Sequence, residues 1–121
     1  MDYFIGHLLG DFVLQTDWQA MNKKKHTLRG WWACSVHCAL YTLAVCACTG
    51  WWSKRLAVLV FLSHFPIDKT LIVARYMRFV GSFRRVIMDP TVDMNHKTWA
   101  YLLVDNTVHL TLLWLIARYA A

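Results

Sequence analysis

Apolar stretches long enough to cross a membrane alternate along this chain with short basic ones. The clearest covers residues 30–50, which contain no Asp, Glu, Lys or Arg and have a pair of tryptophans near each end. About twenty residues of α-helix at 1.5 Å each reach ~30 Å, the thickness of the hydrocarbon core of a bilayer. Tryptophan favours both membrane interfaces. The pattern therefore predicts a transmembrane helix over these residues.

Three more stretches follow the same pattern less perfectly. Residues 56–74 and 99–117 are expected to span the membrane, the former with a kink at Pro66. Residues 3–18 are shorter and more polar, and are expected to form either a barely spanning helix or a re-entrant one. We therefore expect an all-α, polytopic membrane protein, with one domain over residues 1–121 and a bundle of about four transmembrane helices.

Composition agrees with this interpretation, and the charge adds an orientation. The chain is 58% hydrophobic and 17% charged, with a formal net charge of +6. A nucleic-acid surface requires basic side chains along one face with interleaved aromatics, so nucleic acid is not an expected partner. Ten Lys and Arg residues fall on one side of the predicted helices and three on the other. The positive-inside rule then predicts cytoplasmic loops around residues 19–29 and 77–96, with both termini outside.

Histidine and aspartate recur four residues apart in three of the predicted helices. The pairs are His7 with Asp11, His64 with Asp68, and Asp105 with His109. This spacing places both side chains on one helical face. The order reverses in the last pair, whose helix runs in the opposite direction, so every Asp is expected nearer the cytoplasm and every His one turn further out. His37 is expected at a similar depth in the second helix.

Charged carboxylates at this depth cost about 2.5–3.5 kcal/mol each unless they pair, bind a cation or line a wet cavity. A single pair is explained well enough by a structural hydrogen bond, but three pairs in matching layers favour a metal site. Imidazole and carboxylate suit Zn, Mn or Fe. The predicted ligands of this divalent metal are His7, Asp11, His37, His64, Asp68, Asp105 and His109. Cys34 and Cys38 flank His37 but are expected to be packing residues.

Three functions are compatible with such a cluster. The leading hypothesis is a metal-dependent hydrolase or phosphoesterase acting on a lipid or lipid-linked substrate, with Asp11, Asp68 and Asp105 as the candidate catalytic carboxylates. Lys23, Lys24 and Lys25 would then attract an anionic headgroup. The alternatives are a proton or metal-ion conductor that uses the His/Asp ladder, and a membrane inhibitor or scaffold that binds another membrane protein.

Four segments of the sequence resemble a known family. They are GHLLGDFVLQTDWQA (residues 6–20), HCALYT (37–42), HFPID (64–68) and DNTVHL (105–110). In this order they are similar to the motifs of the DUF3307 family of small bacterial and phage membrane proteins, although Asn106 stands where the family usually has Gln. The resemblance implies a location in the bacterial cytoplasmic (inner) membrane and allows a phage origin. A looser similarity of layout connects the chain to predicted membrane-bound metal-dependent hydrolases.

Small residues provide the last sequence signal. In lipid, helices associate through close packing of small side chains and through polar contacts, and four short helices bury little area alone. A homo-oligomer surrounded by membrane lipids is therefore expected. The candidate contact residues are small, and they can equally pack within one subunit: Gly6, Gly10, Ala33, Ala39, Ala44 and Ala47.

Overall fold

The computed structural model describes residues 2–121, and every regular element in this range is a helix. The elements are α1 (Asp2–Leu8), the π-helix η1 (Leu9–Val13), α2 (Asp17–Asn22), α3 (Leu28–Thr49), α4 (Lys54–Lys69), α5 (Ile72–Phe79), α6 (Gly81–Met88) and α7 (Met94–Tyr119). The all-α class expected from the sequence is confirmed.

Two helices, α3 and α7, are long and apolar enough to cross a membrane. They cover nearly all of the stretches 30–50 and 99–117 that were predicted to do so. A third crossing results if α4 and α5 are one span, but these helices are bent by 66° at the break between them. The described chain is thus a helical bundle with two or three candidate membrane spans, compared with the four expected.

The first predicted segment, residues 3–18, is divided. Its helical start comprises seven residues of α1 and five of η1, which reach less than ~20 Å at no more than 1.5 Å per residue. Thr16 then begins α2 with a capping box, because its hydroxyl accepts the backbone N–H of Gln19 while the Gln19 side chain accepts that of Thr16. A length below the hydrocarbon thickness is compatible with the re-entrant alternative.

The sharp bend of the third segment lies at residues 70 and 71, four residues beyond the expected kink. Pro66 remains inside α4. Thr70 ends the helix in an extended conformation (φ −110°, ψ 172°), with its hydroxyl 2.6 Å and its backbone N–H 3.1 Å from the Pro66 carbonyl oxygen. The side chain that caps the last turn therefore fixes the position of the bend.

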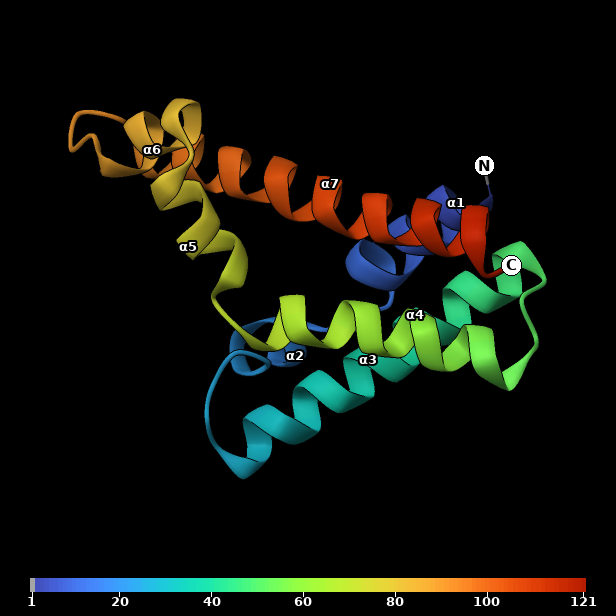
Figure 1. Ribbon diagram of the computed structural model, residues 1–121. Helices are drawn as coiled ribbons and strands as arrows, with labels where there is room; N and C mark the ends of the chain where they lie inside the picture. Colours follow the sequence, from blue (N-terminus) through green and yellow to red (C-terminus); the bar gives the residue numbers. More distant parts are fainter. Residues whose placement is uncertain (1) are drawn as a thin grey trace.

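The helices α3 and α4 form an antiparallel hairpin against which α1, η1, α2, α5 and α7 pack, while α6 packs on α5 and α7 (Figure 1). Two glycines allow α1 to approach α3 closely. A Cβ atom on Gly6 would lie 2.7 Å from the Cα of Val45, and one on Gly10 would lie 3.0 Å from the Cα of Tyr41. Both glycines therefore pack within one subunit. The sequence had left open whether they do so or serve contacts between subunits.

Two apolar clusters lie at different heights of the bundle. One consists of Tyr41, Val45, Val60 and Leu113, near the end that holds both termini and the α3–α4 turn. The other joins α4, α5 and α7 through Ile67, Val73, Met77 and Val104. His64 and His109 lie between these clusters along α4 and α7, while Asp68 and Asp105 directly follow Ile67 and Val104 of the second cluster.

The outer faces of the helices remain apolar. Large hydrophobic side chains stay more than half exposed on α3, α4 and α7, as Leu43, Val58, Leu62 and Leu103 show. Apolar surface of this extent is uncommon on a monomeric soluble protein but is suited to contact with lipid tails.

Candidate metal centre

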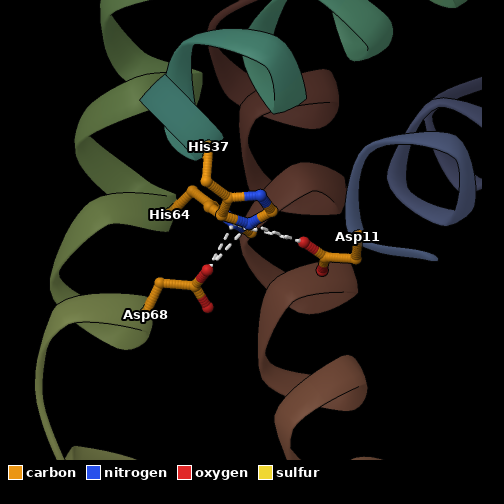
Figure 2. A group of neighbouring side chains, drawn as sticks. All are labelled: Asp11, His37, His64 and Asp68. Atoms are coloured by element: carbon orange, nitrogen blue, oxygen red, sulfur yellow. Dashed lines mark hydrogen bonds and ion pairs between the residues drawn. The ribbon is translucent and has the colours of Figure 1, made fainter. Parts of the chain in front are cut away.

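Side chains from three helical elements point to one place inside the bundle (Figure 2). Asp11 comes from η1, His37 from α3, and His64 and Asp68 from α4. One ligand atom of each residue lies within 4.8 Å of the others, a grouping that could hold a metal ion. His37, His64 and Asp68 are at most 1% exposed. Four of the seven predicted ligands are thus brought together.

The spacing of these atoms fits a tetrahedral cation. His37 Nε2 lies 2.8 Å from Asp68 Oδ2, 3.2 Å from Asp11 Oδ1 and 3.2 Å from His64 Nε2. His64 Nε2 lies 3.4 Å from Asp11 Oδ1 and 3.2 Å from Asp68 Oδ2. Four donors at ~2.0–2.1 Å around a Zn²⁺ ion are about 3.3 Å apart. These five of the six donor–donor separations are close to this value, so the donor set suits a divalent ion in size and chemistry.

A second group shares Asp68 with the first. It consists of Asp68, Asp105 and His109, again with ligand atoms within 4.8 Å of one another. His109 donates from Nδ1 to the backbone carbonyl of Asp105 at 2.9 Å, which leaves the lone pair on Nε2. This Nε2 is buried without a hydrogen-bond partner in residues 2–121 and lies 3.7 Å from Asp68 Oδ1. A lone pair that faces a carboxylate is unfavourable unless a cation or proton lies between them.

His7, which the sequence placed among the ligands, belongs to neither group. Its Nε2 lies 2.7 Å from Asn106 Oδ1, and its Nδ1 lies 3.0 Å from the Tyr41 hydroxyl and 3.3 Å from Asp11 Oδ2. The Asn106 amide donates to the Leu102 carbonyl at 2.7 Å, which orients Oδ1 toward His7. His7 Nε2 therefore carries a proton, and both ring nitrogens have protein partners. Asn106 thus has a polar role here.

Tyr41 packs the histidine layer together. Its ring stacks on His64 with centroids 3.6 Å apart, while its hydroxyl reaches His7. Tyr41 is 1% exposed. Tyr41 was not among the site residues predicted from the sequence, although its position four residues after His37 places it on the same helical face.

The lysines around residues 23–25 are more than orientation signals. Lys24 Nζ lies 3.1–3.3 Å from the carbonyl oxygens of Ile67, Asp68 and Thr70 at the end of α4, and burial lowers the pKa of this amine. Lys69 Nζ donates to the carbonyls of Lys23 and Lys25 and lies 4.4 Å from the ring centroid of Trp31. These two lysines tie the loop before α3 to the end of α4.

Lys23 differs because its ammonium contacts the cluster. Its Nζ lies 2.7 Å from Asp68 Oδ2 and 2.6 Å from Gln15 Oε1. The three aspartates Asp11, Asp68 and Asp105 thus have one ammonium in direct contact with them among residues 2–121. A divalent cation would offset the remaining charge.

A cavity of about 210 Å³ opens beside both groups. It is lined by residues of the cluster and its lysines, among them Asp11, Gln15, Lys23, Asp68, Tyr101 and Asp105. This volume far exceeds the roughly 10–15 Å³ needed by one water. A larger cavity of about 640 Å³ lies between α3 and α4 near Trp51 and Trp52, but none of the His/Asp residues lines it. The smaller cavity is therefore the one that gives access to the site.

One local feature that shapes the site carried no sequence signal. Asp11 lies in the π-helix η1, where the Leu14 N–H bonds to the Leu9 carbonyl five residues back at 2.9 Å. Single π-helical turns are rare and are often found at functional sites. Here the wider turn accompanies the placement of the Asp11 carboxylate beside both His37 and His64.

Comparison with known proteins gives one match. The family model described as "Protein of unknown function (DUF3307)" matches residues 1–121. Neither the curated proteins nor the solved structures contain a match to this chain.

Proposed function

Because this chain belongs to the DUF3307 family, described as a protein of unknown function, we propose from the site alone that it is a membrane-embedded, metal-dependent hydrolase. The observation that carries the proposal is the convergence of two imidazole and two carboxylate donors at tetrahedral spacing beside a cavity. Hydrogen bonding alone explains less, because His109 Nε2 is buried without a hydrogen-bond partner in residues 2–121.

Each cluster residue then has a chemical role. Asp11, His37, His64 and Asp68 would hold a divalent ion such as Zn, Mn or Fe. Such an ion supplies a positive charge that polarises a phosphoryl or carbonyl oxygen and acidifies a water. Asp105 lines the cavity and has a buried Oδ1 without a partner in residues 2–121, so it is suited to accept the proton of the attacking water.

The substrate class follows from where the cavity lies. Its lining combines carboxylates with Lys23 and Lys24, and it lies within a bundle whose outer faces are apolar. An anionic lipid headgroup or a lipid-linked phosphate matches both features. In our proposal the lysine end faces the cytoplasm and both termini lie on the other side of the inner membrane, since the basic residues favour that orientation.

Ion conduction is the second candidate, and the packing argues against it for a single subunit. Beyond the histidines the next inward-facing residues are Val60 on α4 and Leu113 on α7, and on α3 Tyr41 is followed by Val45. These three apolar residues are at most 1% exposed and form one cluster with Tyr41. A relay of ions requires polar groups or water along its whole path. The third alternative, binding to another membrane protein, does not explain why His109 Nε2 is buried without a hydrogen bond in residues 2–121.

The test is hydrolysis by the full-length protein in vesicles. Phosphate release is measured from a lipid phosphate monoester and from a polyprenyl diphosphate, with Zn²⁺, Mn²⁺ or Fe²⁺ added and with chelator. We expect metal-dependent turnover that is lost in Asp68→Ala and kept in His96→Ala, because His96 is exposed on the first turn of α7. Equal rates in wild type and Asp68→Ala, or no release from either lipid with any of the ions, would contradict the proposal.

A further inference from the structure

Of the three lysines near the site, Lys23 alone directs its ammonium at a carboxylate among the described residues. The Nζ atoms of Lys24 and Lys69 are held by backbone carbonyls. Lys23 Nζ lies 2.7 Å from Asp68 Oδ2 and 2.6 Å from Gln15 Oε1, and its side chain is 13% exposed. Lys23 is therefore not required to cap a helix through its side chain, and its ammonium is available for another role.

The contact involves the atom that a metal would use. Asp68 Oδ2 also lies 2.8 Å from His37 Nε2 and 3.2 Å from His64 Nε2, the two imidazole donors of the first group. A cation bound among these three atoms would have the Lys23 ammonium as a direct neighbour. Like charges at this distance repel strongly where water is scarce. The metal and the ammonium thus compete for Asp68.

A Lys23 ammonium that leaves Asp68 can move into the adjacent cavity. Lys23 lines the 210 Å³ cavity, as does Gln15, which can keep its hydrogen bond to Nζ while the lysine leaves Asp68. Lysine carries its charge on a flexible four-carbon stem with three donors and is a frequent phosphate ligand. The cavity in which an anionic substrate would lie is therefore within reach of the same side chain.

We propose that Lys23 is an exchangeable counter-ion. It neutralises Asp68 in the metal-free protein, and when a divalent cation takes Asp68 it turns into the cavity and binds a phosphoryl oxygen of the substrate. The substrate class is accordingly a phosphate ester whose anionic oxygens lie beside the metal. This inference rests on the proposed function and adds to it an order of events, in which metal binding creates the anion site.

The direction in which metal affinity changes when Lys23 loses its charge distinguishes a competing cation from a supporting residue. Removing a residue that supports metal ligands from outside weakens metal binding, typically by 10–100-fold. Removal of a competing cation strengthens it. Lys23→Met keeps most of the length of the side chain and loses the charge, so it should tighten metal binding while weakening phosphate binding.

The experiment uses the detergent-solubilised full-length chain with Mn²⁺ and inorganic phosphate as probes. Free Mn²⁺ is followed by electron paramagnetic resonance, and phosphate binding to the Mn²⁺-loaded protein by calorimetry. We expect Lys23→Met to bind Mn²⁺ about tenfold more tightly and phosphate about tenfold more weakly than wild type. Lys54→Met is the matched control, because Lys54 begins α4 and lines the other cavity, which none of the His/Asp residues lines, and neither affinity should change.

Each outcome decides between the claims. Unchanged or weaker Mn²⁺ binding by a folded Lys23→Met variant overturns the competition, and unchanged phosphate binding overturns the substrate contact, while both leave the metal site standing. Wild type that binds no metal overturns the proposed function and this inference with it. If Lys23→Met does not fold, Lys23→Gln replaces it, since its amide can still bond to Gln15, and it must show the same two signs.

Discussion

The inward-facing residues of the bundle differ in polarity on the two sides of the histidines. Toward the termini, the inward-facing positions Val45, Val60 and Leu113 are apolar and closely packed. Toward the other end, one turn from the histidines, Asp68 and Asp105 border a cavity. The helices α4 and α7 supply both halves: Val60 and Asp68 are eight residues apart, as are Leu113 and Asp105, and a histidine lies midway in each helix. A cavity that is closed on one side and open on the other is typical of a ligand-binding pocket.

Histidine marks the boundary between these halves and has a different role at each position. His37 and His64 lie in the first ligand group, and His109 lies in the second. His7 is bonded through both ring nitrogens to Tyr41 and Asn106. The layer therefore contains both candidate ligands and a structural histidine, and substitutions should separate them.

The largest effect is expected at Asp68, which is common to both ligand groups. Asp68→Ala should lower metal affinity by more than ~100-fold and abolish hydrolysis, because it removes a carboxylate from each group and leaves Lys23 without its partner. Metal content and phosphate release measure the two effects. Asp105→Ala is the comparison, since it leaves all four donors of the first group in place. A metal content in Asp68→Ala equal to that of wild type would count against the shared role.

The sealed half should respond in stability and not in metal binding. Leu113 is 1% exposed within the apolar cluster, so Leu113→Ala should cost about 2–5 kcal/mol of unfolding free energy through the cavity that it leaves. Unfolding in mixed micelles measures the loss, and metal content in the folded fraction is expected to remain that of wild type. Proportional loss of metal in that fraction would mean that the two halves are not independent.

Gly6 connects the halves because it sets how closely α1 approaches α3. A Cβ there would lie 2.7 Å from the Cα of Val45, a backbone atom that cannot turn aside. Gly6→Ala should destabilise the fold by roughly 1–3 kcal/mol and displace Asp11 from His37. Thermal unfolding and metal affinity are both expected to fall. Gly81→Ala is the control, since nothing lies within 4 Å of a Cβ at that exposed position.

The smallest effect is expected at the cysteines beside His37. The Sγ atoms of Cys34 and Cys38 lie 3.9 Å apart and are buried, but neither atom belongs to a ligand group in the described chain. Cys38→Ala should therefore leave metal content unchanged and cost only about 1 kcal/mol of stability. A loss of bound metal in the folded variant would add a thiolate to the site.

The sequence predicted the cluster because its signal is local. Residues four apart share a helical face, so the pairs ending in Asp11, Asp68 and His109 could be recognised without any tertiary information. The spans α3 and α7 were likewise predictable from hydropathy and length. Burial of the charged pairs then required that they meet.

Other features depend on contacts between distant segments. No pattern in the residues around Asp11 predicts the π-helix η1, and the roles of Tyr41 and Asn106 follow from the approach of α1 to α3 and to α7. In the sequence, Lys23, Lys24 and Lys69 were interpreted as orientation signals, and Lys23 and Lys24 also as residues that attract an anionic headgroup. In the structure Lys24 and Lys69 join a loop to the end of α4, and Lys23 contacts Asp68. Local pattern identifies residue types, while tertiary packing decides their partners.

Whether the buried His/Asp cluster binds a divalent metal is best tested by elemental analysis of the purified protein. Wild type, His64→Ala and His96→Ala are compared after supplementation with Zn²⁺, Mn²⁺ or Fe²⁺ and removal of excess ion. We expect near-stoichiometric metal in wild type and in His96→Ala, and loss of the metal from folded His64→Ala. Folded wild-type protein that retains none of these ions, or a His64→Ala variant that retains as much as wild type, would contradict it.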